Sequence, residues 1–142
     1  MQILLYALTL ISPIYSILYS ARIQGTLMCR GKPEAFAELQ LLTWRHFSEN
    51  GIMAEGIYTD EYGRFDIYGY IDQYFRPAGR LWIWHECFED VHAQKGQCKN
   101  WKEFKIPGEF VNRGKLPRVV WNMGSIHLDS EQGGDYLDKC KG

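Results

Sequence analysis

The chain has 142 residues, which is enough for one domain with a modest hydrophobic core of its own. Its composition, 46% hydrophobic and 15% aromatic with 23% charged residues, is that of a globular protein. The formal net charge of −1, with no nucleic-acid-binding motif in the sequence, excludes a globally basic nucleic-acid binder.

The first segment of the chain carries no charge. Residues 1–20 contain no charged residue, residues 3–17 are mostly Leu, Ile, Tyr and Ala, and Ser20 is a small residue at a plausible cleavage point. We therefore expect a secretory signal at 1–20 and a single domain at 21–142. One alternative is a membrane anchor, but that needs about 20 unbroken apolar residues and Pro13 interrupts the run, so we expect no integral membrane protein. Another alternative is a buried strand or helix of the fold.

Four cysteines follow this segment, at Cys29, Cys87, Cys98 and Cys140. An even number in a small exported domain predicts two disulfides, and no pair has the two-residue spacing typical of zinc fingers or ribbons. Four cysteines allow three connectivities. We favour Cys87–Cys98, which closes a short polar loop, and Cys29–Cys140, which ties the last segment to the first strand. We expect each bridge to contribute about 2–4 kcal/mol.

The remaining chain reads as short strands separated by turn signals. Alternating or continuous apolar residues predict seven strands, at 23–29, 37–44, 53–59, 64–70, 80–87, 101–106 and 119–128. Asp60 to Gly63 predicts a tight turn, which suggests that the strands on its two sides form a hairpin. Only 88–95 and 109–112 could be short helical turns, and Gly124 could kink the last strand. This spacing predicts an all-β, two-sheet sandwich of Greek-key type with about seven to eight short strands.

Several segments resemble the nematode transthyretin-like protein family. They are 25–33 (GTLMCRGKP), 59–65 (TDEYGRF), 81–87 (LWIWHEC), 106–107 (IP) and 124–128 (GSIHL), and all four cysteines fall where the family has them. The resemblance implies a secreted, disulfide-bonded, immunoglobulin-like sandwich, which is the transthyretin-like fold. It implies little about activity, because fold does not determine function. Some members are thought to act in extracellular recognition, including recognition of lipid on cell surfaces.

The sequence gives no support for an enzyme. The related hydroxyisourate hydrolases end in Tyr-Arg-Gly-Ser, whereas this chain ends Tyr136-Leu137-Asp138-Lys139-Cys140-Lys141-Gly142. The four histidines are scattered, and none has a Ser or Cys partner at a telling spacing. We therefore expect no catalytic residue, no metal site and no cofactor.

Two features could bind a ligand. Between residues 95 and 118 there are seven basic and two acidic residues, which could attract an anionic surface unless nearby acidic loops balance them. Trp82 and Trp84 fall on one face of their strand, either packed at its rim or exposed for a partner. The candidate ligand-binding residues are Trp82, Trp84, Lys99, Lys102, Lys105 and Lys115.

The leading hypothesis is a secreted, non-enzymatic recognition protein at the cell surface, with a lipid, glycan or protein receptor as its ligand. The alternative is a soluble carrier of a small apolar ligand, formed by a transthyretin-like oligomer around a channel. A third possibility is a structural or antigenic secreted protein without a specific ligand. The sequence does not predict the oligomeric state.

Overall fold

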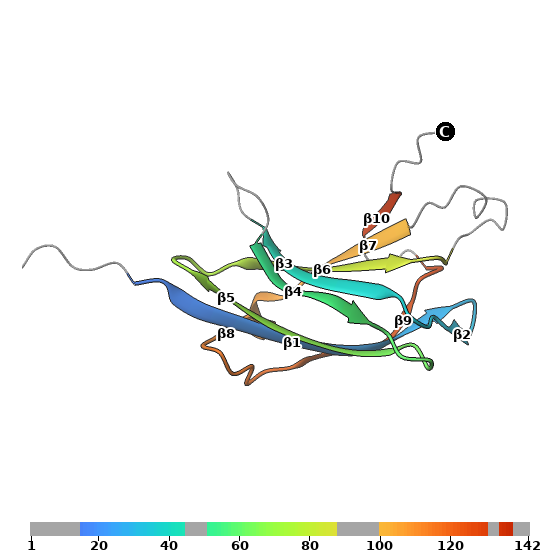
Figure 1. Ribbon diagram of the computed structural model, residues 1–142, viewed down its shortest axis with the longest axis horizontal. Coiled ribbons are helices and arrows are strands. Elements are labelled where there is room, and N and C mark those ends of the chain that lie inside the picture. Colours follow the sequence, from blue (N-terminus) through green and yellow to red (C-terminus); the bar gives the residue numbers. More distant parts are fainter. Residues whose placement is uncertain (1–14, 45–50, 88–99, 131–133, 138–142) are drawn as a thin grey trace, which may run out of the picture.

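The computed structural model describes residues 15–44, 51–87, 100–130 and 134–137 of the chain. They form two sheets packed face to face (Figure 1). Sheet A contains β1 (Ile17–Cys29), β2 (Lys32–Pro33), β5 (Arg64–Gln73), β8 (Asn112–Arg113) and β9 (Trp121–His127). Sheet B contains β3 (Glu38–Trp44), β4 (Gly51–Tyr58), β6 (Ala78–His85), β7 (Asn100–Lys105) and β10 (Gly134–Leu137). The predicted all-β sandwich is confirmed.

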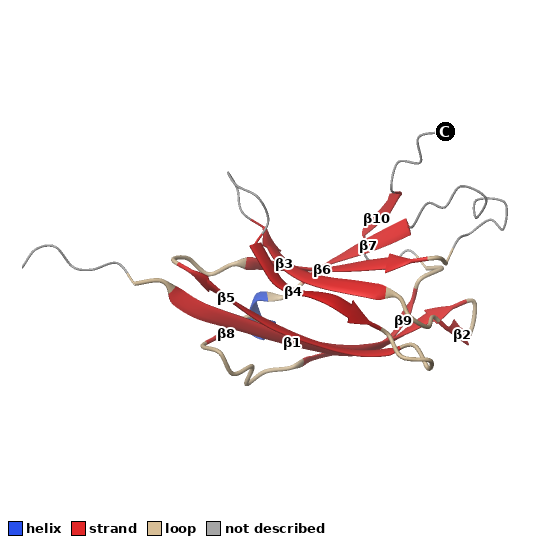
Figure 2. Cartoon of the chain, viewed as in Figure 1, coloured by secondary structure: helices blue, strands red, loops and turns tan. Residues whose placement is uncertain are grey.

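Strands dominate the described chain (Figure 2). A 3-10 turn, η2 (Gly108–Phe110), overlaps the predicted helical turn at 109–112 in its first two residues and confirms it in part. The other predicted helical turn, at 88–95, lies outside the described residues. The strands are more numerous than expected, because β2 and β8 are two-residue bridges and β10 follows the strand that was expected to end the sandwich.

β1 is the centre of sheet A. It pairs antiparallel with β5, where Ile23 lies opposite Ile67, and parallel with β9 on its other side. Its side chains alternate between the interior and the outside in the middle of the strand, which is the pattern of a strand with one buried face. β1 begins at Ile17, so its first four residues fall inside the segment that the sequence predicted as a signal.

A bulge lies where the sequence suggested a kink. The register of β1 with β9 shifts between Gln24 and Thr26, which pair with Asn122 and Ser125. Gly124 has a φ of +67°, a conformation that glycine adopts without strain. The predicted irregularity at Gly124 is therefore confirmed.

The turn at Asp60–Gly63 is confirmed, but the hairpin is wrong. The N–H of Gly63 donates to the carbonyl of Asp60 at 3.0 Å, and the Asp60 side chain accepts from the backbone N–H of Tyr62 and of Arg64. The strands on either side do not pair with each other, since β4 is hydrogen-bonded to β3 in sheet B and β5 to β1 in sheet A. The turn therefore connects the two layers of the sandwich.

The core fills the space between the sheets. Its fully buried side chains come from both layers, and they include Ile23, Leu27 and Ile67 from sheet A and Leu39, Leu41, Leu81 and Ile83 from sheet B. Burial of one Leu or Ile side chain contributes about 1.5–3 kcal/mol. The outer faces of the two sheets are left for other contacts.

Candidate functional site

Three tryptophans lie together on the outer side of sheet B. In β6, Leu81 and Ile83 point into the core, so the alternating Trp82 and Trp84 point outward. In β7, Trp101 lies directly opposite Trp84, and directly opposed residues share a face. We call the outward side of sheet B formed by Trp82, Trp84 and Trp101 the tryptophan face. The predicted common face of Trp82 and Trp84 is confirmed.

The three indoles hold one another in place. The Trp82 ring centroid is 5.7 Å from that of Trp84, edge to face, and 4.9 Å from that of Trp101. Trp84 and Trp101 are stacked at 6.4 Å with an interplanar angle of 28°. These separations are those of favourable aromatic pairs. All three residues are half-buried, so each indole is packed against neighbours and keeps part of its surface accessible.

Polar side chains border the tryptophan face. On the same side of the sheet, Glu103 lies opposite Trp82 and Lys105 opposite Arg80. An ion pair of 3.2 Å joins Arg80 to Glu103, and both side chains are largely covered. On β3, Gln40 lies opposite Trp82 and Glu38 opposite Trp84. The face therefore combines aromatic rings with hydrogen-bonding groups and balanced charges.

Trp101 was missed as a candidate at the sequence level. Its strand reads Trp-Lys-Glu-Phe-Lys over residues 101–105, which has no clear alternation of apolar and polar residues. Only its register with β6 brings it to Trp84. The available signal was that the next predicted strand after Trp82-Ile83-Trp84 also contains a tryptophan.

The predicted basic residues do not form one surface among the described residues. Lys105 is exposed on the outer side of sheet B. Lys115 is exposed beside sheet A, with its Nζ 4.9 Å from the centre of the Tyr70 ring. These two lysines therefore lie on opposite faces of the sandwich. Lys99 lies outside the described residues.

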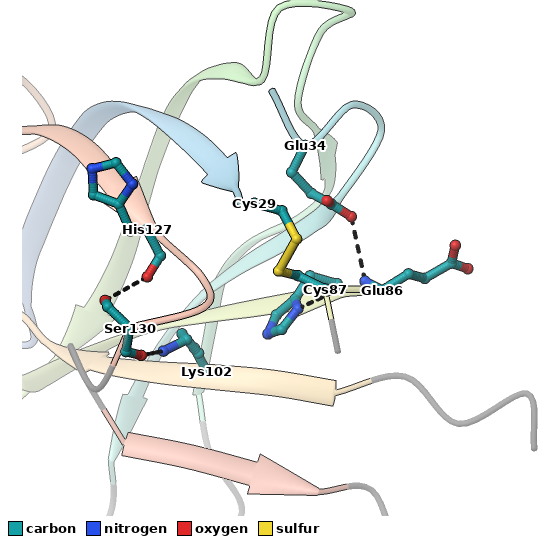
Figure 3. Close-up of a disulfide and its surroundings, with 8 residues drawn as sticks. Cys29, Glu34, Glu86, Cys87, Lys102, His127 and Ser130 are labelled. Atoms are coloured by element: carbon teal, nitrogen blue, oxygen red, sulfur yellow. Dashed lines mark hydrogen bonds between the residues drawn. A yellow bond between two sulfur atoms is a disulfide. The ribbon is translucent and has the colours of Figure 1, made fainter. Parts of the chain in front are cut away.

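Lys102 is buried, contrary to a role at an exposed surface. It lies opposite Ile83 on the core side of β7 and is 0% exposed. Its Nζ donates to the carbonyl oxygen of Ser130 at 2.6 Å (Figure 3). A buried ammonium needs such partners, because an unpaired charge in the interior is very costly. We therefore remove Lys102 from the candidate ligand-binding residues.

The sheet A side carries a tyrosine surface. Tyr68 and Tyr70 point outward from β5 and are 39% and 45% exposed. The Tyr68 hydroxyl donates to the carbonyl of Lys115, and the Lys115 ammonium lies over Tyr70. Nearby, hydrogen bonds from Arg22 lower the pKa of Asp66 against the opposing effect of partial burial. These side chains are largely engaged with one another.

The disulfide connectivity differs from the expected one. Cys29 is bonded to Cys87 with an S–S distance of 2.01 Å, so neither Cys87–Cys98 nor Cys29–Cys140 can form in this structure (Figure 3). The expectation was wrong because it judged each bridge by the segment that it would close or tie down, whereas the sandwich brings Cys29, at the end of β1, beside Cys87, two residues beyond the end of β6. Cys98 and Cys140 lie outside the described residues.

His85 and Glu34 lie near this disulfide. His85 is buried, and its Nδ1 accepts a hydrogen bond from the backbone N–H of Cys87 at 3.0 Å, so its ring supports the backbone beside the bridge. Glu34 accepts from the backbone N–H of Glu86 at 3.4 Å. Partial burial raises the pKa of Glu34; the hydrogen bond lowers it, and the charge of Glu86 raises it further.

Residues 15–44, 51–87, 100–130 and 134–137 contain no group of three or more His, Cys, Asp or Glu side chains that could hold a metal ion. Within the same ranges, no helix is long and apolar enough to cross a membrane.

Comparison with known proteins agrees with the sandwich architecture. Residues 24–107 match the model of the Transthyretin-like family. Transthyretin-like protein 33 of Caenorhabditis elegans is 30% identical over 117 residues, which cover 79% of this chain and 76% of the relative. Transthyretin-like protein 5 of the same organism is 29% identical over 139 residues, which cover 95% and 96%. The chain belongs to the transthyretin-like family.

Proposed function

We propose that this chain is a secreted, non-enzymatic recognition protein that binds a ligand on a cell or matrix surface through the tryptophan face. The observation that carries the proposal is the clustering of Trp82, Trp84 and Trp101 on one outward side of sheet B. Tryptophan is the residue type most enriched among the anchors of binding surfaces. A contiguous apolar patch on the surface of a soluble domain often marks an interaction site.

Export is supported by two independent features. The first 20 residues carry no charge, and the cysteines at 29 and 87 form a disulfide, a bond that persists in oxidising compartments. The same disulfide removes both sulfurs as nucleophiles. The Nδ1 atom of His85 accepts a hydrogen bond from the backbone N–H of Cys87. These contacts favour binding over catalysis.

An anionic lipid is not the ligand we favour. Of the candidate lysines that the structure describes, Lys105 and Lys115 lie on opposite faces and Lys102 lies in the core. Attraction to an anionic surface needs several cations on one side within a Debye length of about 10 Å. The tryptophan face is therefore the better candidate surface.

The test measures binding of the secreted protein to intact cell surfaces. The wild-type protein, a Trp84→Ala variant and a Tyr70→Ala variant would be fluorescently labelled after their folding is checked by circular dichroism. We expect Trp84→Ala to bind at least about tenfold more weakly, since one anchor residue is worth 2 kcal/mol or more. Tyr70→Ala removes an aromatic ring from the opposite face and should bind as the wild type does. Equal binding of all three proteins would contradict the proposal.

The carrier alternative needs an assembly of subunits, because the space between the two sheets is filled by core side chains. Size exclusion with light scattering tests it. A monomer at working concentration has no inter-subunit channel and would rule out this alternative.

A further inference from the structure

We propose that the ligand of the tryptophan face is an uncharged sugar chain, an inference that rests on the proposed function of that face. Its basis is the combination of half-buried indoles, paired charges and hydrogen-bonding side chains on one open surface. Three kinds of occupant could cover such a surface, namely a second copy of the chain, a membrane, and a ligand with a small footprint. Their physical requirements differ.

A second copy of the chain requires more surface than the three indoles provide. A standard protein interface buries about 800 Å² on each partner. Trp82, Trp84 and Trp101 are half-buried, and much of each ring is taken up by contact with the other two. The remaining indole area is therefore less than a stable dimer interface buries. The face therefore suits a ligand that contacts a few rings at a time.

A membrane requires protruding apolar side chains and an excess of positive charge. The three indoles lie against the sheet and against one another instead of standing out at a loop tip. On the three strands β3, β6 and β7, the ionisable side chains on this side are Arg80 and Lys105, balanced by Glu38 and Glu103. With two charges of each sign and a direct ion pair between Arg80 and Glu103, the face does not favour an anionic or a cationic ligand.

An uncharged sugar chain meets each of these conditions. A pyranose ring has faces of C–H groups and a rim of hydroxyls. The C–H groups carry partial positive charge and can lie on the electron-rich face of an indole. The hydroxyls can exchange hydrogen bonds with Gln40, Glu38 and Glu103, which border the rings on the neighbouring strands.

The ring contacts also prepare the face for binding. Each indole already has two aromatic neighbours, so it loses little conformational freedom when a ligand is added. Surfaces that are ordered in advance bind more tightly, because less entropy is lost on association. Adjacent strands are about 4.8 Å apart, so rings on β6 and β7 can contact neighbouring units of one chain.

The experiment is affinity gel electrophoresis of the full secreted protein in gels that contain one soluble neutral polysaccharide each, a β-glucan, a mannan or a glycol chitin without free amines. We expect retardation in at least one gel, unchanged when NaCl is raised to about 0.5 M, since screening affects only charge-driven binding. Trp84→Ala should weaken the retardation about tenfold or more, and Trp84→Phe, which keeps a ring, should weaken it less. Tyr70→Ala is the matched control and should behave as the wild type.

Four outcomes would overturn the inference: no retardation by any neutral polysaccharide, binding only to heparin or to phosphatidylserine vesicles, loss of binding at high salt, or a dimer that Trp84→Ala dissociates. Cell-surface binding separates this failure from failure of the proposed function. If cells still bind the wild type and not Trp84→Ala while every neutral polysaccharide fails, the sugar assignment is wrong and the tryptophan face remains a binding surface. If the Trp84→Ala variant binds cells as strongly as the wild type does, the proposed function itself is wrong.

Discussion

Cys29, the last residue of β1, is covalently joined to Cys87, which lies two residues beyond the end of β6, so the bond connects the two sheets. It closes a segment with a sequence separation of 58 residues. The chain-entropy relation then gives a stabilisation of about 4 kcal/mol. We predict that Cys29→Ala with Cys87→Ala lowers the free energy of unfolding by about that amount in urea denaturation. A loss below about 1 kcal/mol would show that the sheets hold together without the bridge.

The remaining two cysteines should form the second bridge. Asn100 begins β7 and pairs with Leu137, which ends β10. Cys98 precedes the first of these residues by two positions, and Cys140 follows the second by three. We predict a Cys98–Cys140 disulfide, to be found by mass spectrometry of a non-reduced digest. Alkylation of either sulfur without prior reduction would contradict it.

Gly63 should tolerate no side chain. Its φ is +75°, and a Cβ there would lie 2.4 Å from the backbone oxygen of Leu27, which cannot move away without breaking sheet A. Gly31 is the matched control, because its φ is +77° but nothing lies within 4 Å of its Cβ position. We expect Gly31→Ala to cost about 1–2 kcal/mol for the left-handed conformation alone. Thermal unfolding should show a clearly larger loss of stability for Gly63→Ala than for Gly31→Ala. Equal losses of stability in the two variants would contradict this prediction.

The start of β1 bears on where a signal would be removed. Tyr19 and Ser20 are buried, and they pair with Arg113 and Asn112 of β8. Cleavage after Ser20, as the sequence suggested, would remove both from the fold. We predict a mature N-terminus at or before Ile17, measured by sequencing the secreted protein. A chain starting at Ala21 should lose at least about 2 kcal/mol of stability, mainly the buried area of Tyr19. If the two chains are equally stable, these residues are not part of the fold.

Glu34 should make stability depend on pH. Burial raises its folded pKa above the unfolded value, so its contribution to stability is fully present below the unfolded pKa and is lost as the pH rises through the folded pKa. We therefore expect Glu34→Gln to raise the melting temperature at pH 7 relative to the wild type, with the gain shrinking as the pH falls toward 4. Glu61→Gln, at an exposed turn position, is the control and should show no such trend. A gain that is the same at both pH values would contradict the assignment to ionisation.

The strands whose apolar residues are regularly placed could be predicted from the sequence. Leu81 and Ile83 alternate with Trp82 and Trp84, and both the strand and its two faces follow from that pattern. The turn at Asp60 could be predicted too, because aspartate and glycine have specific roles in a tight turn. The pairing of the two strands beside this turn could not be predicted, since local residues do not determine which sheet each strand joins.

The misassigned lysine has a physical cause. Lys102 points inward and Trp101 outward, which reverses the usual preference of both residue types. The reversal is possible because Lys102 can reach the carbonyl of Ser130, a partner that belongs to a later turn of the chain. A contact between residues so far apart leaves no trace in the pattern of β7 itself. Trp101 was missed for a similar reason, because its contacts with Trp82 and Trp84 depend on the register between β6 and β7.

The position of β1 also governs how the protein acquires its structure. β1 is the first strand of the described chain, yet it lies parallel to β9, with Ile23 beside Trp121. A chain leaving the ribosome can pair one edge of β1 with β5, but the other edge, from Ile23 to Met28, has no β9 partner until most of the chain has been made. Pairings between distant residues slow folding, because the loop between them must be closed before any contact forms. A nascent chain stopped before Trp121 would leave the edge of β1 from Ile23 to Met28 unpaired and should be prone to aggregate.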